Sequence, residues 1–465
     1  MEVRRPFVAA ALTVLVAVAA ACGGGNGAGG SGAEAARRSI TVWILENEPD
    51  RIAATKANLA ILARRTGIHA RLVGVTDDDI VARVARARRE GRLPDVMQLP
   101  LELAHAYARA GMLDTAAAGD VVRRLGEPTF SQTALRLVTR EGGVVAVPSD
   151  GWGQLLIYRK DLFDAAGLSP PRTLDDVERA AARLETDGRA GITLATAPDK
   201  PFTAETFEHV ALISGCQLVD ELGEITLTSR RCRSAFRAYV DLAGHSPRGL
   251  VQDADNTRDT YFAGKAAMIF WSPFLLDAMA GLRDDALPTC PQCAADPAYL
   301  ARHSGLVSLL SSRGRQPAQF GSLATWGITT GAAVETSKRF VEYMLSDGYA
   351  RWLALSPQGK YPVRPGDAND PERYERAWAR LRSGVDRKAP LRRFYSEAAI
   401  QALGDGVRNF RRWGFEQGQA PLVGELRESS PVTRALAAAI RGQIDPDRAA
   451  EQAQAAVEKV RASLE

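Results

Sequence analysis

Two short segments of this 465-residue sequence carry residue types that hydrolytic enzymes use. Gly244-His245-Ser246-Pro247-Arg248 comes close to the G-x-S-x-G pattern around a nucleophilic serine, but its fifth residue is arginine. Glu205 and Glu208 could act as the acid pair of a glycosidase, although a sequence does not fix the distance between two carboxylates. The five histidines lack metal-ligand spacing, and no glycine-rich phosphate loop carries a lysine. We therefore expect a binding protein rather than an enzyme, with no cofactor and no metal.

Four cysteines lie in the body of the chain, and their number and spacing favour disulfides in an exported protein. We expect Cys216 to pair with Cys232 across a hairpin that turns at residues 221–224, and Cys290 to pair with Cys293. Two alternatives stay open. The Cys-Pro-Gln-Cys segment would also suit a redox pair, and the four thiols together would suit a structural zinc ion.

Aromatic side chains are the residues best suited to hold a small solute, because an indole offers a broad apolar face. The chain has seven tryptophans, and four of them stand at or next to the predicted strands: Trp43, Trp152, Trp271 and Trp326. Trp152 lies between two glycines, which permit a close approach of the backbone to a ligand. Trp43 lies inside an apolar run and is expected in the core.

Strands and helices alternate along the part of the chain that must position these residues. Strands are predicted over residues 39–45, 69–75, 95–99, 144–147, 154–158, 266–271 and 323–329. Amphipathic helices separate the first three strands, and the residues from about 371 onward are mostly helical. This alternation predicts an α/β fold with βαβ units, a parallel sheet and flanking helices.

Polar side chains follow several of these strands. Ligands of open α/β sheets bind beyond the carboxyl ends of the strands. The candidates at those ends are Glu46, Asn47, Gln98, Asp150 and Gln154. Their carboxylate and amide groups could fix a solute by hydrogen bonds, with the indoles stacked against its apolar faces.

The charge of the chain is close to balance, with 59 basic and 55 acidic residues and a net charge of +4. A nucleic-acid protein usually presents a concentrated basic face, so we expect no nucleic-acid partner. The length suggests two or three compact units with ample material for a core.

The first 38 residues predict export. Arg4 and Arg5 precede an apolar run over residues 7–21, which is short for a membrane span and typical of a signal peptide, here 1–21. Ala19-Ala20-Ala21-Cys22 resembles a bacterial lipobox, so we expect lipidation at Cys22, and the Gly- and Ala-rich stretch to residue 38 then forms a flexible tether. This places the protein at the cell membrane, on its extracytoplasmic face and lipid-anchored. Plain secretion remains an alternative, and the twin arginines leave the export route open.

Several segments occur in an order that resembles a known family. They are Pro94-Asp95-Val96, Val147-Pro148, Tyr158-Arg159-Lys160-Asp161-Leu162-Phe163, Ala166-Gly167-Leu168, Pro171-Arg172-Thr173-Leu174-Asp175-Asp176, Phe262-Ala263-Gly264-Lys265-Ala266-Ala267-Met268 and Trp326-Gly327-Ile328. Together with the lipobox, they resemble the extracellular solute-binding proteins of bacterial ABC importers, family 1, the group of sugar-binding lipoproteins. The resemblance covers residues 39 to about 364.

The resemblance implies the two-lobed periplasmic-binding-protein fold, with a hinge, an interlobe ligand cleft and a helical C-terminus. On that template, lobe 1 takes residues 39–147 with 326–357, and lobe 2 takes 148–325 with 358–465. The protein would be a monomer that captures a carbohydrate, a mono- or oligosaccharide, outside the membrane and delivers it to the transmembrane subunits of an ABC permease. Tyr361-Pro362-Val363-Arg364 resembles the late cleft segment of the family, which adds Arg364 to the candidates.

Two alternatives to a sugar receptor remain. The same fold could bind a polyol, a glycerophosphodiester or a peptide-like solute, and an Arg364 that lines the cleft would favour an anionic ligand. An exported carbohydrate-active enzyme is the third hypothesis.

Overall fold

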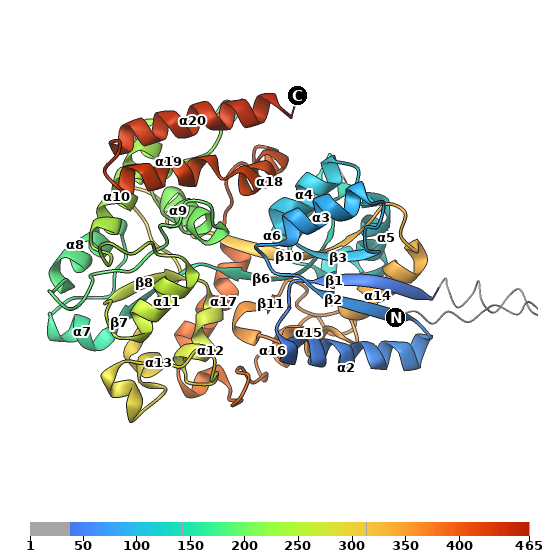
Figure 1. The fold of residues 1–465 in the computed structure, drawn as a ribbon. Coiled ribbons are helices and arrows are strands. Elements are labelled where there is room, and N and C mark those ends of the chain that lie inside the picture. Colours follow the sequence, from blue (N-terminus) through green and yellow to red (C-terminus); the bar gives the residue numbers. More distant parts are fainter. Residues whose placement is uncertain (1–37, 142, 313, 465) are drawn as a thin grey trace, which may run out of the picture. The chain divides into compact units, whose positions relative to one another are not determined.

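The computed structural model describes residues 38–141, 143–312 and 314–464 (Figure 1). The predicted signal peptide, the lipidation site Cys22 and the tether up to residue 37 lie outside the described residues. Residues from Arg38 onward form one unit, which is built around two sheets.

The first sheet has six strands in the order β11-β6-β10-β3-β1-β2. Strands β1 (Ser39–Ile44), β2 (His69–Gly74) and β3 (Val96–Pro100) are parallel, as the sequence predicts. Strands β10 (Gly321–Ile328), β6 (Val147–Gly153) and β11 (Tyr361–Pro362) run antiparallel to their neighbours, so the sheet is mixed. Strand β1 forms because its apolar residues Ile40, Val42 and Ile44 are buried between helices.

Helices and short elements surround this sheet and, with it, make the first lobe. They are α2 (Pro49–Thr66), α3 (Ile80–Arg89), α4 (Leu101–Arg109), α5 (Thr115–Leu125), η1 (Glu127–Thr129), α6 (Gln132–Val138), β4 (Thr139–Arg140), β5 (Gly143–Val144), α14 (Val334–Met344), α15 (Tyr349–Leu353) and η4 (Pro357–Gly359).

The second lobe contains a three-stranded antiparallel sheet in the order β8-β7-β9. Its strands are β7 (Leu155–Arg159), β8 (Met268–Trp271) and β9 (Ser304–Val307). Its helices are α7 (Lys160–Ala165), α8 (Leu174–Leu184), α9 (Pro201–Ile213), α10 (Arg230–Gly244), α11 (Ala254–Phe262), η2 (Pro273–Leu275), α12 (Leu276–Met279), η3 (Pro291–Ala294) and α13 (Tyr299–His303). Helix α8 begins with a reciprocal capping box between Thr173 and Asp176.

The chain crosses between the sheets at β6 and β10. Strand β6 lies in the first sheet and continues through Gln154 into β7 of the second sheet. The prediction of a strand end at Pro148 to Asp150 is therefore wrong. These residues lie inside β6, where a register shift in β10 between Ala324 and Thr325 accommodates the pairing.

The C-terminal part of the chain contacts both lobes. It contains α16 (Arg373–Trp378), η5 (Leu391–Arg393), α17 (Glu397–Asn409), α18 (Ala420–Ser429), α19 (Pro431–Ile440) and α20 (Pro446–Ala462). Helix α17 packs on β6, α18 packs on α4, and α19 and α20 pack on α10 (Figure 1). Strand β11 lies in the first sheet, whereas the prediction assigned everything from residue 358 to the second lobe.

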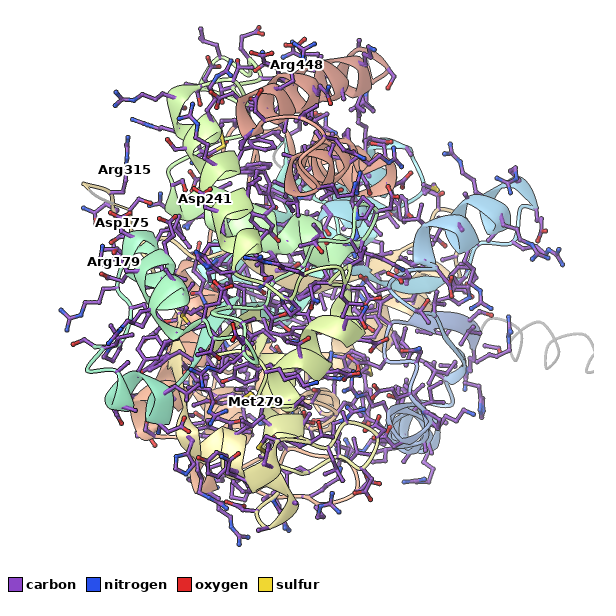
Figure 2. The ribbon with its side chains drawn as sticks, turned by 60° about the vertical axis from the view of Figure 1, so that its left-hand side comes forward. Asp175, Arg179, Asp241, Met279, Arg315 and Arg448 are labelled. Carbon is purple, nitrogen blue, oxygen red and sulfur yellow. A yellow bond between two sulfur atoms is a disulfide. The ribbon has the colours of Figure 1, made fainter. Side chains whose placement is uncertain are left out.

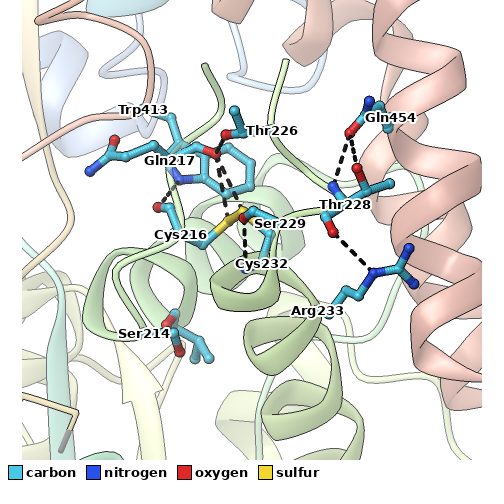
Figure 3. Close-up of a disulfide and its surroundings, with 11 residues drawn as sticks. Ser214, Cys216, Gln217, Thr226, Thr228, Ser229, Cys232, Arg233, Trp413 and Gln454 are labelled. Atoms are coloured by element: carbon cyan, nitrogen blue, oxygen red, sulfur yellow. Dashed lines mark hydrogen bonds between the residues drawn. A yellow bond between two sulfur atoms is a disulfide. The ribbon is translucent and has the colours of Figure 1, made fainter. Parts of the chain in front are cut away.

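Both predicted disulfides are formed. Cys216–Cys232 joins the residues after α9 to the first turn of α10, and the hairpin between them closes with a bridge from Val219 to Ile225. Trp413 donates its indole N–H to the Cys216 carbonyl at 3.0 Å, and Gln454 of α20 accepts from Thr228 on the other side (Figure 3). This disulfide therefore fixes the surface on which the C-terminal helices pack.

Candidate functional site

Acidic residues gather beyond the carboxyl ends of the three parallel strands of the first lobe. They are Glu46 and Glu48 after β1, Asp77 and Asp78 after β2, and Glu102 in the first turn of α4 after β3. Cations from the second lobe and from the C-terminal part meet them: Arg283, Lys200, Arg412 and Arg427. This edge of the first sheet is thus the place where the lobes contact each other.

A buried lysine links the first strand to the crossing strand. Lys360 Nζ lies 2.6 Å from Glu46 Oε1 and 3.1 Å from Asp150 Oδ1, and it stands over the Trp352 ring at 4.3 Å. Trp352 donates its indole N–H to Asp150 at 2.8 Å. Burial alone would raise the pKa of Glu46, but Lys360 and Arg51 outweigh burial and lower that pKa to about 2.

These contacts change the interpretation of two predicted ligand residues. Glu46 has one carboxylate oxygen on Lys360 and the other on Arg51 Nη1 at 2.7 Å, and its side chain is buried. Asp150 is also buried and bonded to Lys360, Trp352 and Ser149. The two carboxylates therefore tie the end of β1 and the middle of β6 to Lys360 rather than facing a solute.

A second set of ions continues from this point into the second lobe. Arg51 Nε lies 2.9 Å from Glu48, whose other oxygen lies 3.1 Å from Arg283 Nη2, and Arg283 also pairs with Asp285 at 2.7 Å. Asp277 of α12 is buried beside them. Burial raises the pKa of Asp277 to about 6, although Arg283 and Arg51 act in the opposite direction.

Aromatic rings with exposed surface lie near the edge where the lobes meet, mainly on its second-lobe side. Trp271, at the end of β8, contacts Phe202 in the first turn of α9 with ring centroids 4.4 Å apart, and both are half-buried. Trp152 is also half-buried and packs on Phe320 at 5.6 Å. Phe202 is two residues from Lys200, which contacts Asp78 of the first lobe at 2.6 Å. Phe202 and Trp271 are thus next to a contact between the lobes.

The structure places the predicted amides in different surroundings. Gln98 is buried, and its Oε1 accepts a hydrogen bond from the Leu45 N–H at 2.8 Å, which ties β3 to the end of β1. Gln154 is buried, and its Nε2 lies 3.5 Å from the Thr206 hydroxyl of α9. Asn47 is exposed. A Cβ at Gly153 would lie 2.4 Å from the Gln319 side chain. The space beside this glycine is therefore occupied by Gln319 and not left open for a ligand.

Trp326 and Arg364 are core residues, and their predicted roles as ligand contacts are wrong. Trp326 is fully buried against Phe340 and Trp352. The Arg364 guanidinium is buried and donates to the carbonyls of Leu125 and Leu345, at the carboxyl ends of α5 and α14. A cation suits these positions because the last carbonyls of a helix lack partners within the helix.

The sequence did not reveal the cations that pair with the carboxylates at this edge, of which Arg283 reaches across from the second lobe, or the ring of Phe202. Lys360, Arg283 and Arg51 follow no strand end, and Phe202 lies in a helix, so the search at strand ends passed over them. A buried lysine carries no local signal, because its partner Asp150 is 210 residues away in the chain.

A second buried charge cluster joins α4, α9 and the C-terminal part. Arg412 donates to Glu208 at 3.0 Å and to Glu102 at 3.1 Å, and Arg427 donates to Glu102 at 2.6 Å and pairs with Asp77. The two arginines lower the pKa of Glu102 to about 2, against the effect of burial. Burial raises the pKa of Glu205 to about 8, with Arg427 opposing and Asp77 adding to the rise.

A large hollow lies elsewhere on the second lobe. It has a volume of about 780 Å³ and is lined by α8, α10 and the loops beside them. Asp175, Asp241 and Arg315 border it (Figure 2). Its lining mixes exposed acids with arginines and lacks aromatic rings, so it differs in character from the edge where the lobes meet.

Comparison with known proteins identifies the class. Residues 49–351 match the family described as bacterial extracellular solute-binding protein. The chain belongs to this family, the extracellular solute-binding proteins of ABC transporters, and it has their two-lobed periplasmic-binding-protein fold with a helical C-terminus. No helix among residues 38–464, as far as they are described, is long and apolar enough to span a membrane.

One curated relative and two solved structures illustrate the similarity. YcjN of Escherichia coli (strain K12), whose name assigns it to the periplasmic-binding proteins of ABC transporters, is 27% identical over 305 residues, which are 64% of this chain and 66% of that protein. The structure titled "Maltose bound T. maritima MalE3" superposes with a TM-score of 0.69 at 18% identity, over 90% of this chain and 99% of that one. A solute-binding protein of Agrobacterium vitis S4 with bound D-mannitol gives a TM-score of 0.62 at 19% identity, over 90% and 97%.

Proposed function

We propose that this protein captures a carbohydrate, a mono- or oligosaccharide, between its two lobes and delivers it to the transmembrane subunits of an ABC permease. The solute would stack on Trp271 and Phe202 of the second lobe, with Trp152 at one side. Asn47 would bond its hydroxyls from the first lobe. The carboxylates Glu46 and Asp150 would act by holding β1 and β6 in position, not by direct contact.

The pair of half-buried rings, Trp271 and Phe202, carries this proposal. A ring stacked on the C–H face of a sugar removes apolar surface from water, while polar groups at the edge fix orientation. The pair lies beside the contact from Lys200 to Asp78, where a solute between the lobes could reach both halves.

The cellular setting belongs to the same proposal. We infer a signal peptide at 1–21, lipid attachment at Cys22 and a monomeric receptor held by its tether at the outer face of the cell membrane. Such a receptor needs no enzymatic activity, since its task ends when the permease accepts the solute.

A polyol is the second candidate, and the similarity to a mannitol-bound structure favours it. A polyol offers the same hydroxyls but no broad ring face, so it would depend less on stacking. An anionic solute is less favoured, because Arg364, the cation expected to bind it, is buried and donates its hydrogen bonds to helix carbonyls.

Intrinsic tryptophan fluorescence with a panel of saccharides and polyols tests the proposal. We expect a saturable change with at least one saccharide, and Trp271→Ala should weaken that binding about 30-fold. Trp43→Phe is the matched control, because Trp43 is buried inside β1. Saturable binding of polyols alone would favour the second candidate, and no saturable response to any of the compounds would contradict both.

A further inference from the structure

We propose that Glu48 and Arg283 form a latch that stabilises the closed arrangement of the lobes, and that Arg412 holds the pivot about which they open. This inference rests on the proposed function only in assuming that solute is taken up by opening and closing. It assigns the control of that motion to two ion-pair sites on the chain.

The latch joins the two lobes directly. Glu48 follows β1 of the first lobe, and Arg283 follows α12 of the second, with 3.1 Å between Oε1 and Nη2. The Glu48 side chain is 36% exposed, whereas that of Arg283 is 11% exposed. Water can therefore replace the pairing of Glu48 when the lobes separate, and an ion pair with one partner open to water is readily broken.

Alternating charges connect the latch to the crossing strand. The series runs from Arg283 to Glu48, Arg51, Glu46, Lys360 and Asp150. Asp150 lies on β6, which passes from one sheet to the other. The latch is thus the exposed end of a series of paired charges, and the buried end on the hinge strand keeps its geometry when the exposed end opens.

The pivot has the opposite character. The Arg412 side chain is 3% exposed and lies between Glu102 of the first lobe and Glu208 of the second. Its backbone neighbour Arg411 bonds to Gln319, and residue 411 pairs with Phe320 just before β10, so this segment runs beside a crossing strand. The Arg412 guanidinium also stands over the Phe320 ring at 4.8 Å.

The latch and the pivot differ in the free energy needed to break their ion pairs. Removing one partner from a buried ion pair leaves an unpaired charge in the interior and is strongly destabilising, so the Arg412 contacts must persist during opening. A motion that keeps them intact has its axis close to them. The half-exposed Glu48 pair can break and re-form at small cost, which is the property that a latch needs.

The test combines small-angle X-ray scattering without solute and binding of the best saccharide or polyol. We expect Arg283→Glu and Glu48→Arg to increase the radius of gyration of the unliganded protein. They should also weaken binding about tenfold, because only the closed fraction binds tightly. The neutral variant Arg283→Gln, which removes the pair without placing a carboxylate beside Glu48 and Asp285, should change the radius and the affinity in the same directions by a smaller amount.

Arg65→Glu serves as the matched control, since Arg65 forms an exposed pair with Asp347 inside the first lobe. If Arg283→Glu, Glu48→Arg and Arg283→Gln all behave like this control, the latch is refuted. If no compound binds at all, the proposed sugar-binding function fails, but the scattering comparison still decides the latch.

Discussion

The two buried charge clusters differ in how their charges are matched. Around Lys360, each carboxylate has close cationic partners, and Glu46 keeps a pKa of about 2. Around Arg412 and Arg427, four carboxylates share two guanidiniums. There Glu102 takes both cations and has a pKa of about 2, while Glu205 is left with a pKa of about 8. Burial raises the pKa of both glutamates. The number of cations in contact with each carboxylate decides whether its final pKa is low or high.

Arg412→Met breaks the second cluster at its centre. The variant leaves Glu102 and Glu208 with less compensation inside the protein, and we expect a loss of about 3–5 kcal/mol in the free energy of unfolding. Denaturant unfolding followed by circular dichroism measures it. Arg448→Met, which removes an exposed pair with Glu451, should change stability by less than about 1 kcal/mol.

Lys360→Met applies the same change to the first cluster, with a somewhat smaller expected loss of about 3 kcal/mol. The loss is smaller because Glu46 retains Arg51 and Asp150 retains Trp352 and Ser149. Adding Glu46→Gln and Asp150→Asn to Lys360→Met should recover part of the stability in the same unfolding measurement. A triple variant less stable than Lys360→Met would show that the carboxylates do not depend on the lysine.

Glu205 makes stability depend on pH. Its pKa rises from an ordinary 4.5 to about 8 in the folded protein, so folding favours the protonated form. Stability should therefore fall as the pH increases from about 5 to 8 and level off above 8. We expect Glu205→Gln to flatten this slope and to raise the thermal midpoint at pH 8 by about 2 °C, measured by scanning calorimetry from pH 5 to 9.

Glu46 and Glu102 act in the opposite direction at acidic pH. Their pKa values are lowered to about 2, so the stability they contribute is present above about 4.5 and disappears as the pH falls toward 2. The rise in stability from Glu46 and Glu102 above acidic pH, together with the fall caused by Glu205 at higher pH, predicts the greatest stability near pH 5. If Glu205→Gln keeps the alkaline slope of the unmodified protein, Glu205 is not its cause.

Of these variants, Trp326→Phe should have the smallest effect on solute binding. Trp326 lies in the core, so the variant should lose about 1–2 kcal/mol of stability and keep its affinity for solute within about twofold. Calorimetric titration against Trp271→Ala checks this contrast. If Trp326→Phe loses affinity as strongly as Trp271→Ala, Trp326 contributes to solute binding and its assignment to the core alone is contradicted.

The fold was accessible to sequence reasoning where the signal is local. Apolar runs predicted β1, and the number and spacing of the cysteines predicted both disulfides. The extent of β6 was not accessible, because Pro148 and two glycines imitate a loop and the pairing with β10 forms only in the complete sheet.

The candidate site was predicted in part. The search at strand ends led to Glu46 and Asp150, yet both proved to be bonded to Lys360, which is distant in sequence. Arg364 illustrates the same difficulty, since the helix carbonyls that hold it come from α5 and α14. Residue type and position do not reveal whether a polar group is already satisfied by the protein.

A crystal structure of the protein grown with the tightest-binding saccharide tests the central claim most directly. The account predicts the sugar between the lobes, with a ring stacked on Trp271 beside Phe202 and with Glu48 paired to Arg283. A sugar bound instead in the hollow lined by Asp175 and Asp241, with Trp271 uncovered, would contradict it.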